Sequence, residues 1–323
     1  MTTRQLVLEA AERIKGNGRV TPILNSPFLD DIAGRRVFVK AECLQHTGSF
    51  KFRGGWNAVS ALPDDVRAKG VLAFSSGNHA QGIANAARAH GVPATIVMPA
   101  DAPALKIANT RALGANVVLY DRAIEDREEV ARGVSQDLTL IKPYDEPMVI
   151  AGQGTLGLEV LDQTRDLVTG PADVLMCCGG GGLTSGVSLA LEGSNLRARP
   201  VEPEGFDDVA RSLISGKHEV NDRQHGGLCD AIITPTPGEI TFPIMQANCG
   251  PGLVVSEDEA LHAMALAFTR LKIVVEPGGA VALAAALFRP DEIEGDAVIA
   301  VTTGGNVDPD VFRMALDKFG GET

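Results

Sequence analysis

Four glycines join a strand to a helix in the stretch Asp173-Val174-Leu175-Met176-Cys177-Cys178-Gly179-Gly180-Gly181-Gly182-Leu183. Because these glycines have no side chains, an anion can approach their backbone amides closely, and the N-terminus of the next helix adds its positive dipole end. The turn therefore predicts a phosphate-binding site. A dinucleotide is a weaker interpretation, because the GxGxxG spacing and a downstream ribose-binding acid are missing. A flexible turn without a ligand is the other alternative.

Short β-branched runs alternate with helical stretches on both sides of this turn. The strands that we expect are residues 37–40, 71–74, 94–98, 116–120, 173–176 and 297–301. The clearest helices that we expect are residues 80–89, 104–113, 125–134 and 257–271. This alternation predicts an α/β fold with open, twisted, mostly parallel sheets and helices on both faces. Ligands of such sheets bind at the loops beyond the carboxyl ends of the strands.

Composition and charge narrow the possible functions. The chain has 323 residues, of which 45% are hydrophobic and 36 are glycine, and this is enough for two packed lobes. A net charge of -12 argues against nucleic acid or an anionic membrane surface as a partner. The N-terminus does not read as a signal peptide, and no apolar run approaches the length of a membrane span. Five cysteines without a CxxC pair are typical of reduced thiols, so we expect a cytoplasmic protein that acts on a small molecule.

Lys51 lies in Ser49-Phe50-Lys51-Phe52-Arg53-Gly54-Gly55, between an apolar stretch and a glycine-rich turn. Partial desolvation lowers the pKa of a lysine, and its neutral amine is then a nucleophile towards an aldehyde. Taken alone, this segment is better explained by a surface lysine at the start of a helix. The case for a reactive lysine depends on the rest of the chain.

Three more polar turns accompany Lys51 and the glycine turn, namely Ser75-Ser76-Gly77-Asn78-His79, Glu276-Pro277-Gly278-Gly279 and Thr302-Thr303-Gly304-Gly305-Asn306. Their order and spacing, over nearly the whole chain, resemble the fold-type II pyridoxal 5'-phosphate (PLP) enzymes. Within these, the chain is similar to the threonine and serine dehydratases and to the branch of serine racemases and 3-hydroxyaspartate dehydratases. The resemblance implies a tryptophan synthase β-like fold and a homodimer. It also implies a discontinuous large domain, residues 1–52 and 146–323, around a small domain, residues 53–145.

The resemblance implies PLP as the cofactor. The residues that it assigns to cofactor binding are Lys51, Phe50, Asn78, Gly179, Gly180, Gly181, Gly182, Leu183, Glu276 and Thr303. In this assignment Lys51 attaches the cofactor and serves as general base, Asn78 bonds the ring hydroxyl and Thr303 bonds the ring nitrogen. Simpler roles stay open, because Asn78 could cap a helix and Thr303 could be an ordinary strand residue. Glu276 could complement a helix dipole.

The residues that the resemblance assigns to the substrate are Ser75, Ser76, Gly77, His79, Arg127 and Thr234. A hydroxyl at Ser76 would also be catalytic, because it can exchange a proton on the face opposite Lys51 and so permit racemisation. Arg127 could bind a second carboxylate, which 3-hydroxyaspartate has and threonine lacks. The alternatives are a small residue at position 76 chosen for space, an exposed Arg127 paired with its acidic neighbours, and a structural His79.

The segment Glu202-Pro203-Glu204-Gly205-Phe206-Asp207-Asp208 is similar to the divalent-cation site of serine racemases. The resemblance implies three oxygen ligands, from the carboxylates of Glu202 and Asp208 and the backbone carbonyl of Phe206. Such donors suit Mg²⁺, and also Ca²⁺ or Mn²⁺. An acidic turn without a metal is the alternative.

Together these features predict a PLP-dependent ammonia-lyase, or dehydratase. It would convert a 3-hydroxy amino acid (3-hydroxyaspartate, serine or threonine) into a 2-oxo acid and ammonia by α,β-elimination. An amino-acid racemase is one alternative. A catabolic threonine dehydratase is another, because the chain continues for only one helix after Asn306 and we expect no regulatory domain. A nucleotide-binding oxidoreductase leaves Lys51 without a task, and an inactive binding protein is disfavoured by the intact set of cofactor residues.

Overall fold

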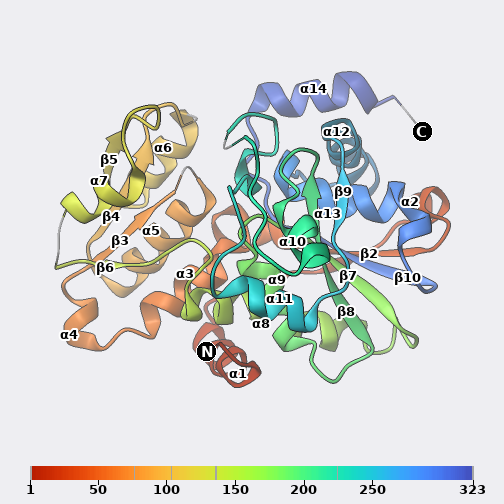
Figure 1. The fold of residues 1–323 in the computed structure, drawn as a ribbon, viewed down its shortest axis with the longest axis horizontal. Helices are drawn as coiled ribbons and strands as arrows, with labels where there is room; N and C mark the ends of the chain where they lie inside the picture. Colours follow the sequence, from red (N-terminus) through yellow and green to blue (C-terminus); the bar gives the residue numbers. More distant parts are fainter. Residues whose placement is uncertain (1, 76, 103, 135–136, 224, 322–323) are drawn as a thin grey trace.

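The computed structural model describes residues 2–75, 77–102, 104–134, 137–223 and 225–321. Within these ranges the strands form two sheets, which Figure 1 shows side by side, the smaller on the left and the larger on the right. The larger sheet has the order β1-β2-β10-β7-β8-β9, and only its edge strand β1 runs antiparallel to its neighbour. Its strands are β1 (Ile23–Leu24), β2 (Arg36–Ala41), β7 (Ala172–Cys177), β8 (Leu196–Pro203), β9 (Leu253–Val255) and β10 (Ala297–Thr302).

The smaller sheet is parallel throughout, with the order β5-β4-β3-β6. Its strands are β3 (Val71–Phe74), β4 (Ala94–Pro99), β5 (Asn116–Tyr120) and β6 (Thr139–Leu140). The helices near it are α3 (Lys51–Ser60), α4 (Asp64–Arg67), α5 (Asn78–His90), α6 (Ala104–Ala112) and α7 (Arg127–Val134). Residues of α3 and α5 pack against one face, whereas Ala131 of α7 packs against the other.

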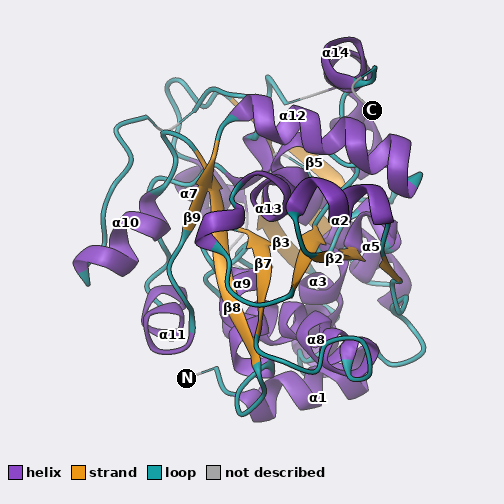
Figure 2. Cartoon of the chain, turned by 90° about the vertical axis from the view of Figure 1, so that its right-hand side faces the viewer, coloured by secondary structure: helices purple, strands orange, loops and turns teal. Residues whose placement is uncertain are grey.

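Helices also cover both faces of the larger sheet (Figure 2). Alternate strand residues explain the two layers: Val298 and Ala300 pack with α2, α12 and α13, whereas Ile299 and Val301 pack with α8 and α9. The helices of this part are α1 (Arg4–Ile14), α2 (Pro27–Ala33), α8 (Pro147–Thr164), α9 (Gly182–Ala190), α10 (Asp208–Ser215), α11 (Thr241–Asn248), α12 (Glu257–Leu266), α13 (Pro277–Phe288) and α14 (Pro309–Phe319). Short helical turns are η1 (Glu42–Leu44), η2 (His46–Gly48), η3 (Asp230–Ile232), η4 (Ala267–Leu271) and η5 (Pro290–Glu292).

The predicted fold class, with two mostly parallel sheets and helices on both faces, is confirmed. Each expected strand lies within an observed one. The expected helix over residues 257–271 is α12 followed by a π-helical turn, η4. Strand β8 was missed because Arg197 and Arg199 interrupt its apolar run, and both side chains pair with Asp173 on β7. The two domains with boundaries at residues 52/53 and 145/146 stay a prediction.

In the part of the chain that the structure describes, no helix is both long enough and apolar enough to cross a bilayer. The site depends instead on three strand ends. The chain leaves β3 at Phe74, β7 at Cys177 and β10 at Thr302, and each exit leads directly into one of the polar turns described above. Parallel strands bring such exits to the same edge of a sheet, which is where ligands bind.

Candidate active site

A pocket of about 130 Å³ lies at these strand ends, between the two sheets. The residues predicted to bind cofactor or substrate that line it are Phe50, Lys51, Ser75, Gly77, Asn78, His79, Arg127, Gly179, Gly180, Gly181, Gly182, Leu183, Thr234, Glu276 and Thr303. Ser76 lies outside the described residues. The structure thus brings together segments from both ends and the middle of the chain.

Lys51 is the first residue of α3 and points its amine into this pocket. Its Nζ donates to the Pro143 carbonyl at 2.8 Å, and no carboxylate of the described residues lies within ion-pair distance of it. Burial without a counter-charge lowers the pKa of Lys51 to about 8. A useful fraction of the amine is therefore neutral near physiological pH, as a nucleophile or base requires.

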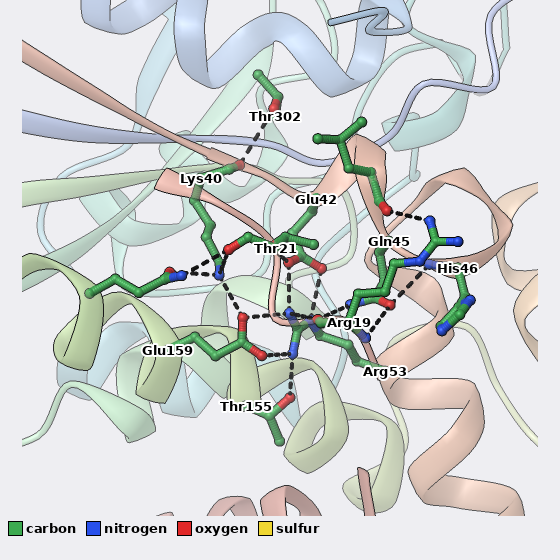
Figure 3. A network of polar contacts seen from close by, with 12 residues as sticks. Arg19, Thr21, Lys40, Glu42, Gln45, His46, Arg53, Thr155, Glu159 and Thr302 are labelled. Atoms are coloured by element: carbon green, nitrogen blue, oxygen red, sulfur yellow. Dashed lines mark hydrogen bonds and ion pairs between the residues drawn. The ribbon is translucent and has the colours of Figure 1, made fainter. Parts of the chain in front are cut away.

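A buried ion network anchors α3 just behind Lys51 (Figure 3). The guanidinium of Arg53 donates to both oxygens of Glu42 and to both oxygens of Glu159, at 2.7 to 2.9 Å. Lys40 donates to Glu159 as well, at 2.5 Å. Two cations and two carboxylates thus tie α3 to η1, β2 and α8. The direction in which Lys51 leaves the helix is fixed from behind.

The glycine turn has the form of an anion cradle. Gly181 has φ +88°, a left-handed conformation that favours glycine. A Cβ on Gly180 would lie 2.3 Å from the ring of Tyr144, and one on Gly179 would lie 2.8 Å from the Ile232 carbonyl oxygen. Helix α9 starts at Gly182, so its N-terminus borders the pocket. The lack of space for side chains and the helix end both fit the phosphate of PLP.

A chain of hydrogen bonds crosses the pocket from the smaller to the larger sheet. Asn78 donates from Nδ2 to Glu276 at 2.5 Å, and its Oδ1 accepts from Asn306 at 2.7 Å. Gly77, not Asn78, is the N-cap residue of α5, so Asn78 does not serve as that helix's cap. Burial raises the pKa of Glu276 to about 7, although the ammonium of Lys106 opposes this rise. The contacts hold the Asn78 amide in one orientation at the pocket wall.

Thr303 follows β10 directly and is buried. Its carbonyl accepts from the Phe50 N–H at 3.0 Å, and its own N–H donates to the Gly279 carbonyl at 3.2 Å. The first bond ties Thr303 to the residue that precedes Lys51. Its hydroxyl lies on the pocket wall, and its bond to the ring nitrogen stays a prediction.

The turn after β3 places a serine and a histidine at the pocket. Ser75 accepts from the Gly77 N–H at 3.1 Å. The Nε2 of His79 lies 3.0 Å from the Ile141 carbonyl oxygen. Burial lowers the pKa of His79 to about 3, and the charge of Lys51 adds to this effect. His79 is therefore neutral at physiological pH, which suits a structural role better than that of an acid.

Arg127 begins α7 at the mouth of the pocket. Its guanidinium carbon lies 4.9 Å from the centre of the Phe74 ring, and the guanidinium hydrogen-bonds the Tyr144 side chain. Burial raises the pKa of Tyr144, and Arg127 opposes this rise. Among the described residues no acidic side chain lies within 4.0 Å of Arg127, so the expected alternative of pairing with its acidic neighbours does not describe this conformation.

Sequence reasoning missed Lys106, Tyr144 and Asp230 in this pocket. The Nζ of Lys106 lies 3.5 Å from Asp230 and 4.0 Å from Glu276, so α6 of the smaller sheet reaches two acids of the larger part. No local pattern marks these residues. Tyr144 had one signal, because its segment follows β6 and so leaves the carboxyl end of a strand.

The expected cation ligands lie outside the pocket lining. Both Glu202 oxygens accept backbone N–H groups, from Val209 at 3.0 Å and Ala210 at 2.7 Å. Asp208 accepts from Asn221 at 2.6 Å, and its Oδ2 is buried with no hydrogen-bond partner among the described residues. Burial raises the pKa of Glu202 well above its usual range and that of Asp208 to about 7. The orphaned oxygen and these two buried carboxylates fit a bound cation, but the described residues contain no group of three or more metal-binding side chains.

Comparisons with known proteins agree with this geometry. Residues 14–304 match the family described as pyridoxal-phosphate dependent enzymes. An L-threo-3-hydroxyaspartate ammonia-lyase from Pseudomonas sp is 45% identical over 96% of this chain and 97% of that protein. A serine racemase from Schizosaccharomyces pombe is 41% identical over 97% of this chain and 96% of that protein. Among solved structures, the T.th. threonine deaminase has a TM-score of 0.88 and 44% identity, over 94% of this chain and 98% of that one.

Proposed function

The chain belongs to the family of pyridoxal-phosphate dependent enzymes, and from that premise we propose that it is an ammonia-lyase whose preferred substrate is 3-hydroxyaspartate. The observation that carries the proposal is the placement of an unpaired Lys51 amine in one pocket with the glycine turn and Arg127. Relatives named L-threo-3-hydroxyaspartate ammonia-lyase, at 45% and 44% identity, support the substrate class.

The residues of the pocket suit PLP. We assign the phosphate to the amides of Gly179 to Gly182 and to the N-terminus of α9, and the ring to Asn78, Thr303 and the neighbouring Phe50 and Glu276. When bound, PLP supplies an aldehyde for the amino group of the substrate and a ring that accepts electrons from its α-carbon. The neutral Thr303 hydroxyl does not hold a ring nitrogen protonated as a carboxylate would, which favours rapid elimination over racemisation.

Lys51 provides the base. Its amine, once free, removes the α-proton, and the β-hydroxyl of the substrate leaves as water after taking up a proton. The organic product is an enamine, which tautomerises to an imine and is hydrolysed in water to a 2-oxo acid and ammonia. The low pKa of Lys51, about 8, lets the same amine serve as base and carry the proton.

Recognition of the substrate falls to both walls of the pocket. We assign the α-carboxylate to the turn formed by Ser75, Ser76 and Gly77, beside His79. Arg127 at the pocket mouth takes the second carboxylate, for which a planar guanidinium is well suited. The Thr234 hydroxyl, which has no partner among the described residues, offers a further hydrogen bond.

A divalent cation at Glu202, Phe206 and Asp208 completes the proposal, with Mg²⁺ favoured over Ca²⁺ or Mn²⁺. The orphaned Asp208 oxygen is its main support. We expect a chelator to lower the thermal unfolding midpoint, and Mg²⁺ to restore it. Free thiols at all five cysteines support a cytoplasmic location, and a homodimer follows from the family resemblance alone.

The direct test is a substrate panel. Release of 2-oxo acid and ammonia is measured with the isomers of 3-hydroxyaspartate, L-serine, D-serine and L-threonine. We expect the highest kcat/KM with a 3-hydroxyaspartate isomer; equal values for threonine would make the chain a threonine dehydratase. Chiral inversion of the remaining substrate, measured in the same reactions, tests the racemase alternative, which the serine racemase relatives favour.

A further inference from the structure

Tyr144 lies at the junction of two cavities. One is the pocket of about 130 Å³ described above, and the other is a neighbouring cavity of about 190 Å³. Four residues line both, namely Phe74, Arg127, Pro143 and Tyr144. A side chain in this position borders any substrate atom that extends from the inner pocket towards the mouth.

The backbone around Tyr144 is held on both sides. The preceding carbonyl, of Pro143, accepts from the Lys51 amine at 2.8 Å, and the following side chain, of Asp145, accepts from the Ile240 N–H at 2.8 Å. The Tyr144 ring packs so closely on the glycine turn that a Cβ on Gly180 would meet it at 2.3 Å. Lys51, the glycine turn and the start of α11 thus fix the place of this tyrosine.

The hydroxyl end of Tyr144 contacts Arg127. That arginine is exposed on α7, so it would otherwise lose rotamer freedom worth about 2 kcal/mol when it binds an anion. Instead, its guanidinium lies 4.9 Å from the centre of the Phe74 ring and hydrogen-bonds Tyr144. A cation held in place before the ligand arrives binds more tightly, because less of the ordering cost remains.

Resting on the proposed function, we propose that Tyr144 is a positioning residue that presets Arg127 for the second carboxylate of a dicarboxylic 3-hydroxy amino acid. Tyr144 thereby sets the preference for hydroxyaspartate over serine. Neither the turn motifs nor the cofactor assignment calls for a tyrosine here. The aromatic ring spans the distance between the rigid glycine turn and the exposed arginine.

Tyr144→Phe tests this role, because phenylalanine keeps the ring on Gly180 and loses only the hydroxyl. We expect the ratio of kcat/KM for 3-hydroxyaspartate to kcat/KM for L-serine to fall about tenfold, which is the value of one hydrogen bond to a charged group. The fall should arise from KM for hydroxyaspartate, with kcat and the cofactor absorbance retained. A merely structural role would lower both substrates alike.

Binding without turnover gives a second readout. L-malate carries the same carbon skeleton and both carboxylates but no amine. Calorimetry on the holoenzyme should give a Kd for L-malate about tenfold weaker in Tyr144→Phe, and at least as weak in Arg127→Met. In the double variant the tyrosine change should add little, because its effect acts through the arginine.

The outcomes separate this inference from the proposed function. If Arg127→Met loses the preference and Tyr144→Phe keeps it, the positioning role is wrong and the proposed function stands. If neither variant changes the ratio, Arg127 does not bind the second carboxylate, and both assignments fall. A parallel loss with serine and hydroxyaspartate also overturns the inference, because Tyr144 would then act on the glycine turn. A wild-type enzyme inactive on hydroxyaspartate contradicts the proposed function itself.

Discussion

Lys40 and Lys51 are two lysines of the interior with opposite surroundings. Lys40 is fully buried, and its amine donates to three acceptors, Thr21 at 2.7 Å, Glu159 at 2.5 Å and Gln163 at 2.8 Å. Among the described residues Lys51 has one acceptor, the Pro143 carbonyl. The first amine has as many partners as it has protons. The second has one partner and no counter-charge, so it is available to a ligand.

The same contrast holds for the charges around each lysine. In the network of Figure 3, Arg53 and Lys40 are balanced by Glu42 and Glu159, and every pair is in hydrogen-bond contact. In the pocket, Lys106 and Glu276 stand 4.0 Å apart. Buried charges with complete partners hold the fold, whereas buried charges with incomplete partners mark the place where a ligand completes the set.

The largest effect is expected at the lysine with few partners. Lys51→Met should lower turnover at least about ten-thousandfold, because both cofactor attachment and the base are lost. Its unfolding midpoint in urea should not fall, because one carbonyl contact is all that disappears. Ammonia release and urea denaturation measure the two properties. Retained turnover, or a large loss of stability, would erase the difference between the two lysines.

The complete network should respond in the opposite way. Arg53→Met leaves Glu42 and Glu159 without their main partner, so we expect a loss of about 3–5 kcal/mol in the free energy of unfolding. Denaturant titration measures it. Arg165→Met is the matched control, because its pair with Asp162 is exposed and should contribute less than about 1 kcal/mol. Equal losses in both variants would show that the buried network is not what stabilises α3.

Glu276 sharpens the comparison through pH. In cofactor-free protein its folded pKa is about 7, above the usual 4.5, so between these values the folded state holds a proton that the unfolded state has released. Its ionisation therefore lowers stability as pH rises through that window, by up to about 3 kcal/mol. Denaturant titrations at several pH values should show Glu276→Gln gaining on the wild type from pH 4.5 to 7 and no further above. A constant difference would mean that Glu276 has an ordinary pKa.

A smaller effect concerns the rate of cofactor attachment. Because the Lys51 amine must be neutral to attack an aldehyde and its pKa is lowered to about 8, attachment should accelerate with pH up to that value and then level off. The slope below it should be about tenfold per pH unit. Absorbance near about 410 nm, followed after PLP is added to cofactor-free protein, measures this rate. Acceleration that continues to pH 10 would indicate an unperturbed lysine.

What the sequence could predict was local. The glycine turn, Asn78 and Thr303 each follow a strand directly, so periodicity and turn chemistry were enough to put them at one sheet edge. The partners of charged groups were beyond its reach: Arg53 and Glu159 are separated by 106 positions. The contacts of Tyr144 with Gly180 and Arg127, and of Lys106 with Glu276, depend in the same way on how the two sheets meet.

The most direct test of the account is to locate the cofactor chemically. Holoenzyme is reduced with borohydride, which makes the bond between lysine and cofactor permanent, and the labelled peptide is identified by mass spectrometry. The account predicts a single label on Lys51, with Lys40 and Lys106 unmodified. A label on either of those lysines, or no label on a protein that turns over its substrate, would contradict it.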